Sequence, residues 1–377
     1  MVKFGCPEFC GTILIGINLI ESGEVISRII NRNVNRIINR NVNNTMNFFY
    51  RVFLKTFARK SYRRVKLEKK SRESFEKNSQ EFLDRARELR IDFPPEGKPG
   101  YSFKHSGNAG DIIYSLPALY ALADGAETDF YLNLDQPANF SIVRGRHPLS
   151  GVMLNREMFS MLRPLLLAQP EITRCEVYDG QCVDYDLDVF RKSALSLSSG
   201  NIARWYFLHF AVNADLGKPW LRARPNHAVS DYVVIARSQG YHSPGIDYSF
   251  LHKYGKLMFV GLAEEFRAMR KALPALEYHP VSDFLELAGV IAGCRFFIGN
   301  QSFPFSIAEA LKVMRVLEVC HHCPNVIVEG CNGYDFCYQA QFERIVDKLA
   351  RQCDVGEAFP ESGIQPCSTG NTEISLN

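Results

Sequence analysis

One carboxylate, that of Asp111, stands where a glycine-rich turn leads from an apolar strand into an apolar helix expected over 112–123. The turn contains Gly107, Asn108 and Gly110, and its glycines let the backbone turn tightly and approach a ligand. A helix N-terminus offers free N–H groups and positive potential. An ionised aspartate there can accept a proton from a bound hydroxyl. The sequence therefore predicts a general base at Asp111, or alternatively a residue that caps its own helix.

A second polar turn joins an expected strand to an expected helix within 296–313. Backbone N–H groups and hydroxyls at such a turn can hold a phosphate. The alternative is an ordinary turn, with Ser306 as the cap of a helix that begins there. The candidate phosphate-binding residues of this turn are Asn300, Gln301, Ser302, Pro304 and Ser306.

Short apolar strands alternate with helices along two stretches, 101–225 and 226–352, and a proline-containing link at 217–227 separates them. This alternation predicts parallel sheets that are covered on both faces. We therefore expect an α/β fold with two Rossmann-like domains that face a cleft. In such sheets ligands bind at the carboxyl ends of the strands.

Three further segments are expected outside these domains: a basic, Asn-rich and poorly ordered segment (1–59), a charged helix with a linker (60–100) and a tail (353–377). Residues 1–100 contain 20 Lys and Arg against 11 Asp and Glu, whereas residues 101–377 contain 24 against 30. We interpret the basic segment as a solvated tail, with a weak membrane-surface contact as the alternative. No nucleic-acid partner is predicted.

The 11 cysteines are odd in number and scattered, which predicts reduced thiols and a cytoplasmic protein. Four of them have spacings that zinc could use, although partly buried thiols are the commoner explanation: Cys320, Cys323, Cys331 and Cys337. Three acidic residues alternate as calcium ligands do, but without the glycine and glutamate of an EF-hand: Asp184, Asp186 and Asp188. We expect no metal and no cofactor.

Two segments, "AGDIIYSLPAL" (109–119) and "GNQSFPFSIAEAL" (299–311), together resemble the motifs of heptosyltransferase-like glycosyltransferases (glycosyltransferase family 9, GT-B fold). In that family a Gly-Asp turn precedes a Leu-Pro-Ala-Leu-like segment, and a Gly-Asn-Asp-Ser-Gly-Pro loop precedes a helix of small residues. The resemblance covers about 101–330 in order and spacing, and it is sharp at these two motifs.

The resemblance implies an enzyme that transfers a sugar from a nucleotide sugar to a hydroxyl of a glycan or lipid-linked acceptor, with inversion and without a metal. Asp111 matches the catalytic base, the first domain would bind the acceptor, and loop 299–306 would hold the donor diphosphate. Arg237 and Ser238 match positions that often contact phosphate. Arg237 can bind a phosphate with two N–H groups, with a surface salt bridge as its alternative role.

Three residues depart from the family pattern: Gln301, Phe303 and Ser306 replace its usual Asp, Gly and frequent His. Because the loop is bulkier and less charged, a second hypothesis is a degenerate GT-B protein that binds a glycan or nucleotide without turnover. A third is a polysaccharide pyruvyltransferase, which shares the early Gly-Asn-x-Gly-Asp-like turn. The Arg-x-His motif of that class is absent from the later part of the sequence.

Overall fold

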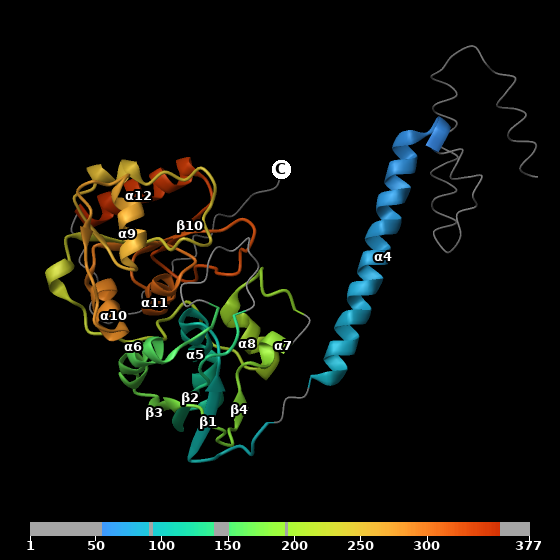
Figure 1. Cartoon of the computed structure of the whole chain (residues 1–377), viewed down its shortest axis with the longest axis horizontal. Coiled ribbons are helices and arrows are strands. Elements are labelled where there is room, and N and C mark those ends of the chain that lie inside the picture. Colours follow the sequence, from blue (N-terminus) through green and yellow to red (C-terminus); the bar gives the residue numbers. More distant parts are fainter. Residues whose placement is uncertain (1–54, 90–92, 139–150, 193–194, 355–377) are drawn as a thin grey trace, which may run out of the picture. The chain divides into compact units, whose positions relative to one another are not determined.

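The computed structural model describes residues 55–89, 93–138, 151–192 and 195–354 (Figure 1). The chain divides into two compact units, Met1–Asp84 and Arg85–Asn377. Most of the segment predicted to be poorly ordered, and most of the predicted tail, lie outside the described residues.

Helix α4, Arg59–Glu88, is a 30-residue charged helix with no buried side chain. Lys, Arg, Glu and Gln are good helix formers. Each pair of opposite charges four residues apart adds about 0.3–0.5 kcal/mol to the stability of a helix. Three such pairs lie along α4: Arg64–Glu68 (2.9 Å), Lys69–Glu73 (3.5 Å) and Arg72–Glu76 (2.8 Å).

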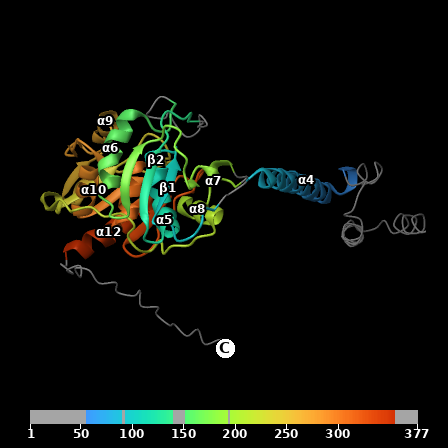
Figure 2. The same cartoon turned by 90° about the horizontal axis from the view of Figure 1, so that it is seen from below.

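The first sheet of the second unit has four parallel strands in the order β3-β2-β1-β4. Its strands are β1 (Gly100–His105), β2 (Glu127–Leu132), β3 (Ile172–Val177) and β4 (Tyr185–Asp186). Its helices are α5 (Ala109–Ala123), α6 (Arg156–Leu167), α7 (Val189–Lys192) and α8 (Ile202–Phe210). Helices α5 and α8 lie side by side (Figure 2).

The second sheet has six parallel strands in the order β10-β9-β8-β5-β6-β7. Its strands are β5 (Tyr232–Ala236), β6 (Lys256–Phe259), β7 (Glu277–Tyr278), β8 (Phe296–Asn300), β9 (Arg315–Glu318) and β10 (Gly333–Phe336). Its helices are α9 (Ala263–Arg270), α10 (Phe284–Gly293), α11 (Phe303–Leu311) and α12 (Gln339–Asp354), with 3-10 turns η2 (His227–Val229) and η3 (Ser249–Lys253). The predicted α/β fold with two parallel sheets is confirmed.

Some predicted elements differ from the structure. Helix α5 begins at Ala109 rather than at 112, and α11 begins at Phe303 rather than near Ser306. Proline is well tolerated in the first turn of a helix, so Pro304 marks the start of α11 and not a loop before it.

Each sheet has one point at which the strand order reverses. In the first sheet β1 lies between β2 and β4, and in the second sheet β5 lies between β6 and β8. Beyond the carboxyl ends of the strands, such a switch point leaves a crevice in which ligands of open α/β sheets bind. The two switch points therefore lie at the ends of β1 and β4 and of β5 and β8.

Helices of the two halves pack against each other, α5 against α11 and α6 against α10. One apolar core continues across both sheets, and it includes Ile112 and Leu116 of α5 together with Ile307 and Ala308 of α11. A separate cluster on the other face of the second sheet includes Phe342 of α12. Strand residues alternate between the two clusters, as expected for a sheet covered on both faces.

Pro117 lies inside α5 without ending it. Because proline has no N–H, the carbonyl of Ile113, four residues earlier, loses its helical partner. The indole Nε1 of Trp220 donates a hydrogen bond to this carbonyl at 3.1 Å. The backbone N–H groups of Trp220 and Leu221 both donate to the carbonyl of Ala310 in α11, at 3.0 and 3.3 Å. The link between the halves is thereby fixed to both.

We predict that Trp220→Phe lowers the free energy of unfolding partly because the Ile113 carbonyl loses its only indole donor, a cost of about 1–3 kcal/mol. In a Pro117→Ala background the helix supplies an N–H to this carbonyl, so the same substitution should cost about 1 kcal/mol less there. Urea unfolding of the four proteins of this cycle measures the difference. Equal costs in both backgrounds would contradict the assignment.

Candidate active site

Asp111 lies in the first turn of α5, beyond the carboxyl end of β1. The N-cap position belongs to Asn108, and the Asp111 carboxylate instead accepts a hydrogen bond from Arg191 Nη2 at 2.5 Å. Both side chains are about one fifth exposed. The main contact of Asp111 is therefore with Arg191, and Asp111 is not the N-cap of its own helix.

Arg191 belongs to the short helix α7, which follows β4. Its Nη1 donates to Asp188 Oδ1 at 2.9 Å, and its guanidinium lies 4.7 Å from the centre of the Phe190 ring. The same Asp188 oxygen accepts the backbone N–H of Ser106 at 2.9 Å. Burial opposes the charge of Arg191, but the carboxylates of Asp111 and Asp188 outweigh it and raise the pKa of this guanidinium. Arg191 thus holds Asp111 against the turn after β1.

A buried histidine sets the geometry of that turn from the inside. The N–H of Gly107 donates to His105 Nδ1 at 2.8 Å, so the proton of the neutral ring must reside on Nε2. Nε2 lies 2.8 Å from Tyr206 Oη, and Tyr206 in turn donates to the backbone carbonyl of Asp111 at 3.2 Å. Burial, aided by the charge of Arg191, lowers the pKa of His105 to about 3. The ring is therefore neutral at physiological pH.

The two glycines of the turn have different neighbours. A Cβ at Gly107 would lie 2.1 Å from Arg191 Nη2, so this position admits no side chain while Arg191 keeps its place. A Cβ at Gly110 would lie 3.8 Å from Ser306 Oγ and 3.9 Å from the Cα of Phe303. The glycine-rich turn and the start of α11 are therefore neighbours, so the structure brings the two sequence motifs together.

The three alternating aspartates are bound along β1. Asp184 accepts hydrogen bonds from the N–H and hydroxyl of Ser102, at 2.8 and 2.9 Å, and Asp186 pairs with Lys104 at 2.8 Å. Asp188 binds Ser106 and Arg191 as described. Their spacing of two thus follows the period of the neighbouring strand rather than the pattern of a calcium loop.

At the second switch point, Arg237 is committed to a buried carboxylate. Its Nε and Nη2 donate to the two oxygens of Glu318 at 2.7 and 2.8 Å. Glu318 also accepts the N–H of Ser243 at 2.7 Å and the hydroxyl of Tyr248 at 2.8 Å. The Arg237 side chain is 17% exposed, so its alternative role proves to be a largely buried salt bridge and not a surface one.

The donor-loop side chains are also largely used inside the protein. Asn300 accepts the N–H of Ser238 at 3.0 Å and donates to the Gly240 carbonyl at 2.6 Å. Gln301 donates to the Cys323 carbonyl at 2.7 Å and accepts the N–H of Cys320 at 2.6 Å.

The hydroxyl of Ser306 is buried and donates to the Phe303 carbonyl at 2.6 Å. Ser306 is therefore not the cap of its helix, because the N-cap position of α11 is Ser302. The half-buried residues at this helix start are Ser302, Phe303 and Pro304.

The cysteines considered for zinc are spread over different environments. Cys320 and Cys323 are buried beside Gln301, Cys331 is exposed, and Cys337 is half-buried. Within the described residues, no group of three or more His, Cys, Asp or Glu side chains could hold a metal ion. In the same part of the chain, no helix is long and apolar enough to cross a lipid bilayer.

Three residues of these two sites escaped the sequence reasoning: His105, Arg191 and Glu318. His105 and Glu318 stand in otherwise apolar strands, and a polar residue in a buried strand needs a partner. That signal could have identified them. Arg191 carried no local signal, because α7 reaches Asp111 only through the tertiary fold.

No protein-family model matches the chain, and no curated protein matches its sequence. Solved structures with a similar arrangement include a family 9 glycosyl transferase from Veillonella parvula (12% identity, 67% of this chain and 97% of that one, TM-score 0.45). Another is heptosyltransferase WaaC of E. coli with ADP (10% identity, 66% of this chain and 99% of that one, TM-score 0.46). A third is the iron-containing dodecameric heptosyltransferase TibC (12% identity, 68% of this chain and 77% of that one, TM-score 0.43). These are glycosyltransferases of the kind that the two motifs resemble. The similarities are weak in sequence and in superposition, so the function proposed below rests on the residues of the chain itself.

The lowered pKa of His105 predicts a specific pH dependence of stability. Between pH 6.5 and about 3 the unfolded chain binds a proton at this ring that the folded protein excludes, so the free energy of unfolding decreases as the pH is lowered through this range. His105→Gln keeps a hydrogen-bond acceptor and a donor but has no ring to protonate, so it lacks this loss of stability. The difference in unfolding free energy between wild type and variant should shrink by about 2 kcal/mol from pH 7 to pH 5.

Urea unfolding at the two pH values measures this change. His227→Gln, at an exposed position, is the matched control and should leave the pH dependence of the wild type unaltered. The assignment fails if the His105→Gln and wild-type curves run parallel.

Proposed function

We propose that this protein is a glycosyltransferase that moves a sugar from a nucleotide-sugar donor to an acceptor hydroxyl in glycan or surface polysaccharide synthesis. One observation carries the proposal: the Asp111 carboxylate lies partly exposed at the switch point of the first sheet, and Gly110, the residue before it, lies beside the start of α11. A base and a helix N-terminus that can hold an anion are the two groups that such a transfer needs.

In the proposed reaction Asp111 accepts the proton of the acceptor hydroxyl as its oxygen attacks the anomeric carbon. The new C–O bond forms while the bond from that carbon to the donor phosphate breaks, and the nucleoside diphosphate leaves with the electron pair. Attack opposite the leaving group inverts the anomeric centre. Arg191 would act as a positioning residue, because its contact with Asp111 fixes the carboxylate in one orientation.

The leaving diphosphate would bind at the start of α11, where Ser302, Pro304 and the backbone of Phe303 are half-buried and not enclosed. The positive end of the helix would stabilise its charge without a metal. In this proposal Arg237, Asn300, Gln301 and Ser306 shape the site through their internal contacts. Ser238 is half-buried at the same switch point, and its hydroxyl accepts a hydrogen bond from Asn300 Nδ2 at 3.1 Å.

A second candidate is a GT-B-like protein that binds a nucleotide or glycan without turnover. The ion pair between Asp111 and Arg191 favours it, because the guanidinium already occupies one oxygen of this carboxylate at 2.5 Å. The internal use of the donor-loop side chains points the same way. This candidate shares the donor site with the first and differs from it in the role of Asp111.

We predict that one of ADP, UDP, GDP and CMP stabilises the full chain against heat, by about 2.7 kcal/mol at a hundredfold excess over its Kd. With nucleotide sugars carrying that nucleotide, wild-type protein should release the same nucleotide. Asp111→Asn should lower this turnover about 10²- to 10⁴-fold while nucleotide stabilisation persists. Asp231→Asn, at an exposed position remote from the turn, is the matched control.

The outcomes separate the candidates. Stabilisation without turnover in the wild type would support the binding protein. Turnover that is unchanged in Asp111→Asn would refute the role of this carboxylate, and the absence of any stabilisation would refute the nucleotide site that both candidates share.

A further inference from the structure

The first half of α4 presents a regular row of positive charge. Residues 59–72 contain eight Lys and Arg and a single acidic residue, Glu68. Four of the basic residues follow one another at intervals of four, three and four: Arg59, Arg63, Lys66 and Lys70. This spacing places their side chains along one face of a helix over about 16 Å. We call this row the cationic stripe.

The cationic stripe is available for a partner. All four of its residues are exposed, and among the described part of the chain none of them takes part in an ion pair. Other basic residues of the same helix differ, since Arg64, Lys69 and Arg72 pair with glutamates one turn further on. The row therefore holds positive charge that the helix does not neutralise.

Three positions in this stretch are half-buried: Ser61, Tyr62 and Val65. At about 100° per residue, Ser61 and Val65 point away from the cationic stripe, and Tyr62 lies about a fifth of a turn from it. The four residues of the stripe are all more exposed than these three.

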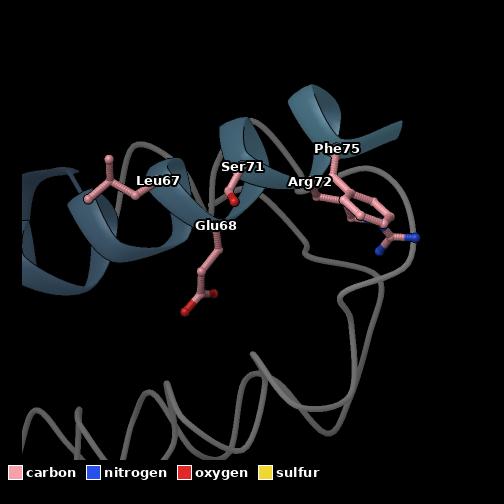
Figure 3. Close-up of a pocket in the computed structure, with 5 residues that line it drawn as sticks. All are labelled: Leu67, Glu68, Ser71, Arg72 and Phe75. Atoms are coloured by element: carbon pink, nitrogen blue, oxygen red, sulfur yellow. The ribbon is translucent and has the colours of Figure 1, made fainter. Parts of the chain in front are cut away.

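One large apolar side chain adjoins the charge. Leu67, four residues after Arg63, is 67% exposed and lies about a fifth of a turn from the cationic stripe. Phe75 is 72% exposed but points to the other side of the helix. Both line a hollow along the helix together with Glu68, Ser71 and Arg72 (Figure 3). An exposed leucine beside a row of lysines and arginines suits a helix that lies in the interface of a membrane.

We propose that the first half of α4 binds the surface of an anionic lipid bilayer. The cationic stripe contacts the headgroups, and Leu67 enters the boundary between headgroups and acyl chains. Charge alone would also suit a nucleic acid, but a phosphate backbone offers nothing apolar to this side chain. The charge of α4 suits a helix that lies on a membrane. The proposal is independent of the transfer reaction.

The test is co-sedimentation of the full chain with vesicles of phosphatidylcholine containing about 30% phosphatidylglycerol, against pure phosphatidylcholine. Each basic residue near an anionic surface contributes about fivefold to affinity. The triple variant Arg63→Gln, Lys66→Gln, Lys70→Gln should therefore bind the anionic vesicles about a hundredfold more weakly. Glutamine is a good helix former, so circular dichroism should show unchanged helix content.

The matched control removes the same charge elsewhere: Arg267→Gln, Lys271→Gln, Arg344→Gln, all at exposed positions of the second unit. This control should bind the anionic vesicles as the wild type does. If it lost as much affinity as the stripe variant, net charge alone would explain the result. Leu67→Gln should weaken vesicle binding about tenfold.

Three results would overturn the proposal. The first is no binding of wild type to the anionic vesicles at low salt. The second is an unchanged vesicle affinity of the triple variant. The third is full vesicle binding by Leu67→Gln together with tight, stripe-dependent binding of duplex DNA or RNA, which would assign α4 to a nucleic acid.

Discussion

The contact between Arg191 and Asp111 holds the first switch point together. One guanidinium links helix α5, helix α7 and, through Asp188, the turn after β1. Because both ions are largely removed from water, loss of either would leave a charge with poor hydration and no partner. A side chain at Gly107 would clash with Arg191, and the charge of Arg191 adds to the burial that keeps the His105 ring neutral.

The second switch point is built around a carboxylate too, but to the opposite effect. Glu318 is fully buried and accepts hydrogen bonds from Arg237, Ser243 and Tyr248. Asp111 accepts from Arg191 alone among the described residues and keeps part of its surface in solvent. A saturated carboxylate stabilises a fold, whereas one with acceptor capacity to spare can receive a proton. This difference in hydrogen bonding and exposure, more than the sequence motif around Asp111, distinguishes Asp111 as the candidate base from Glu318.

Periodicity sufficed to predict the two parallel sheets, because strands buried on both faces are continuous apolar runs. It missed β4 and β10, because strands of two and four residues are too short to carry a pattern. It also missed that Asp184–Asp188 runs alongside β1. The glycine turn and Asp111 were visible for a similar local reason. The partner of Asp111 was not, since 80 residues separate it from Arg191 and only the fold brings them together. Likewise, the sequence predicted Gln301 as a phosphate ligand, but it could not predict the contacts of this side chain with Cys320 and Cys323, which only the fold creates.

The fixed link between the two sheets has a consequence for motion. Two-domain proteins commonly close on a ligand by rotation about a few connecting residues that absorb changes in φ and ψ. Here Trp220 and Leu221 are bonded to α11, the Trp220 indole is bonded to α5, and the Arg222 N–H donates to Gln169 at 2.8 Å. A hinge at these residues would have to break all of these bonds at once. The two sheets should therefore respond to ligands as a single rigid body, and any rearrangement that admits a substrate falls to the surface loops at the ends of the strands.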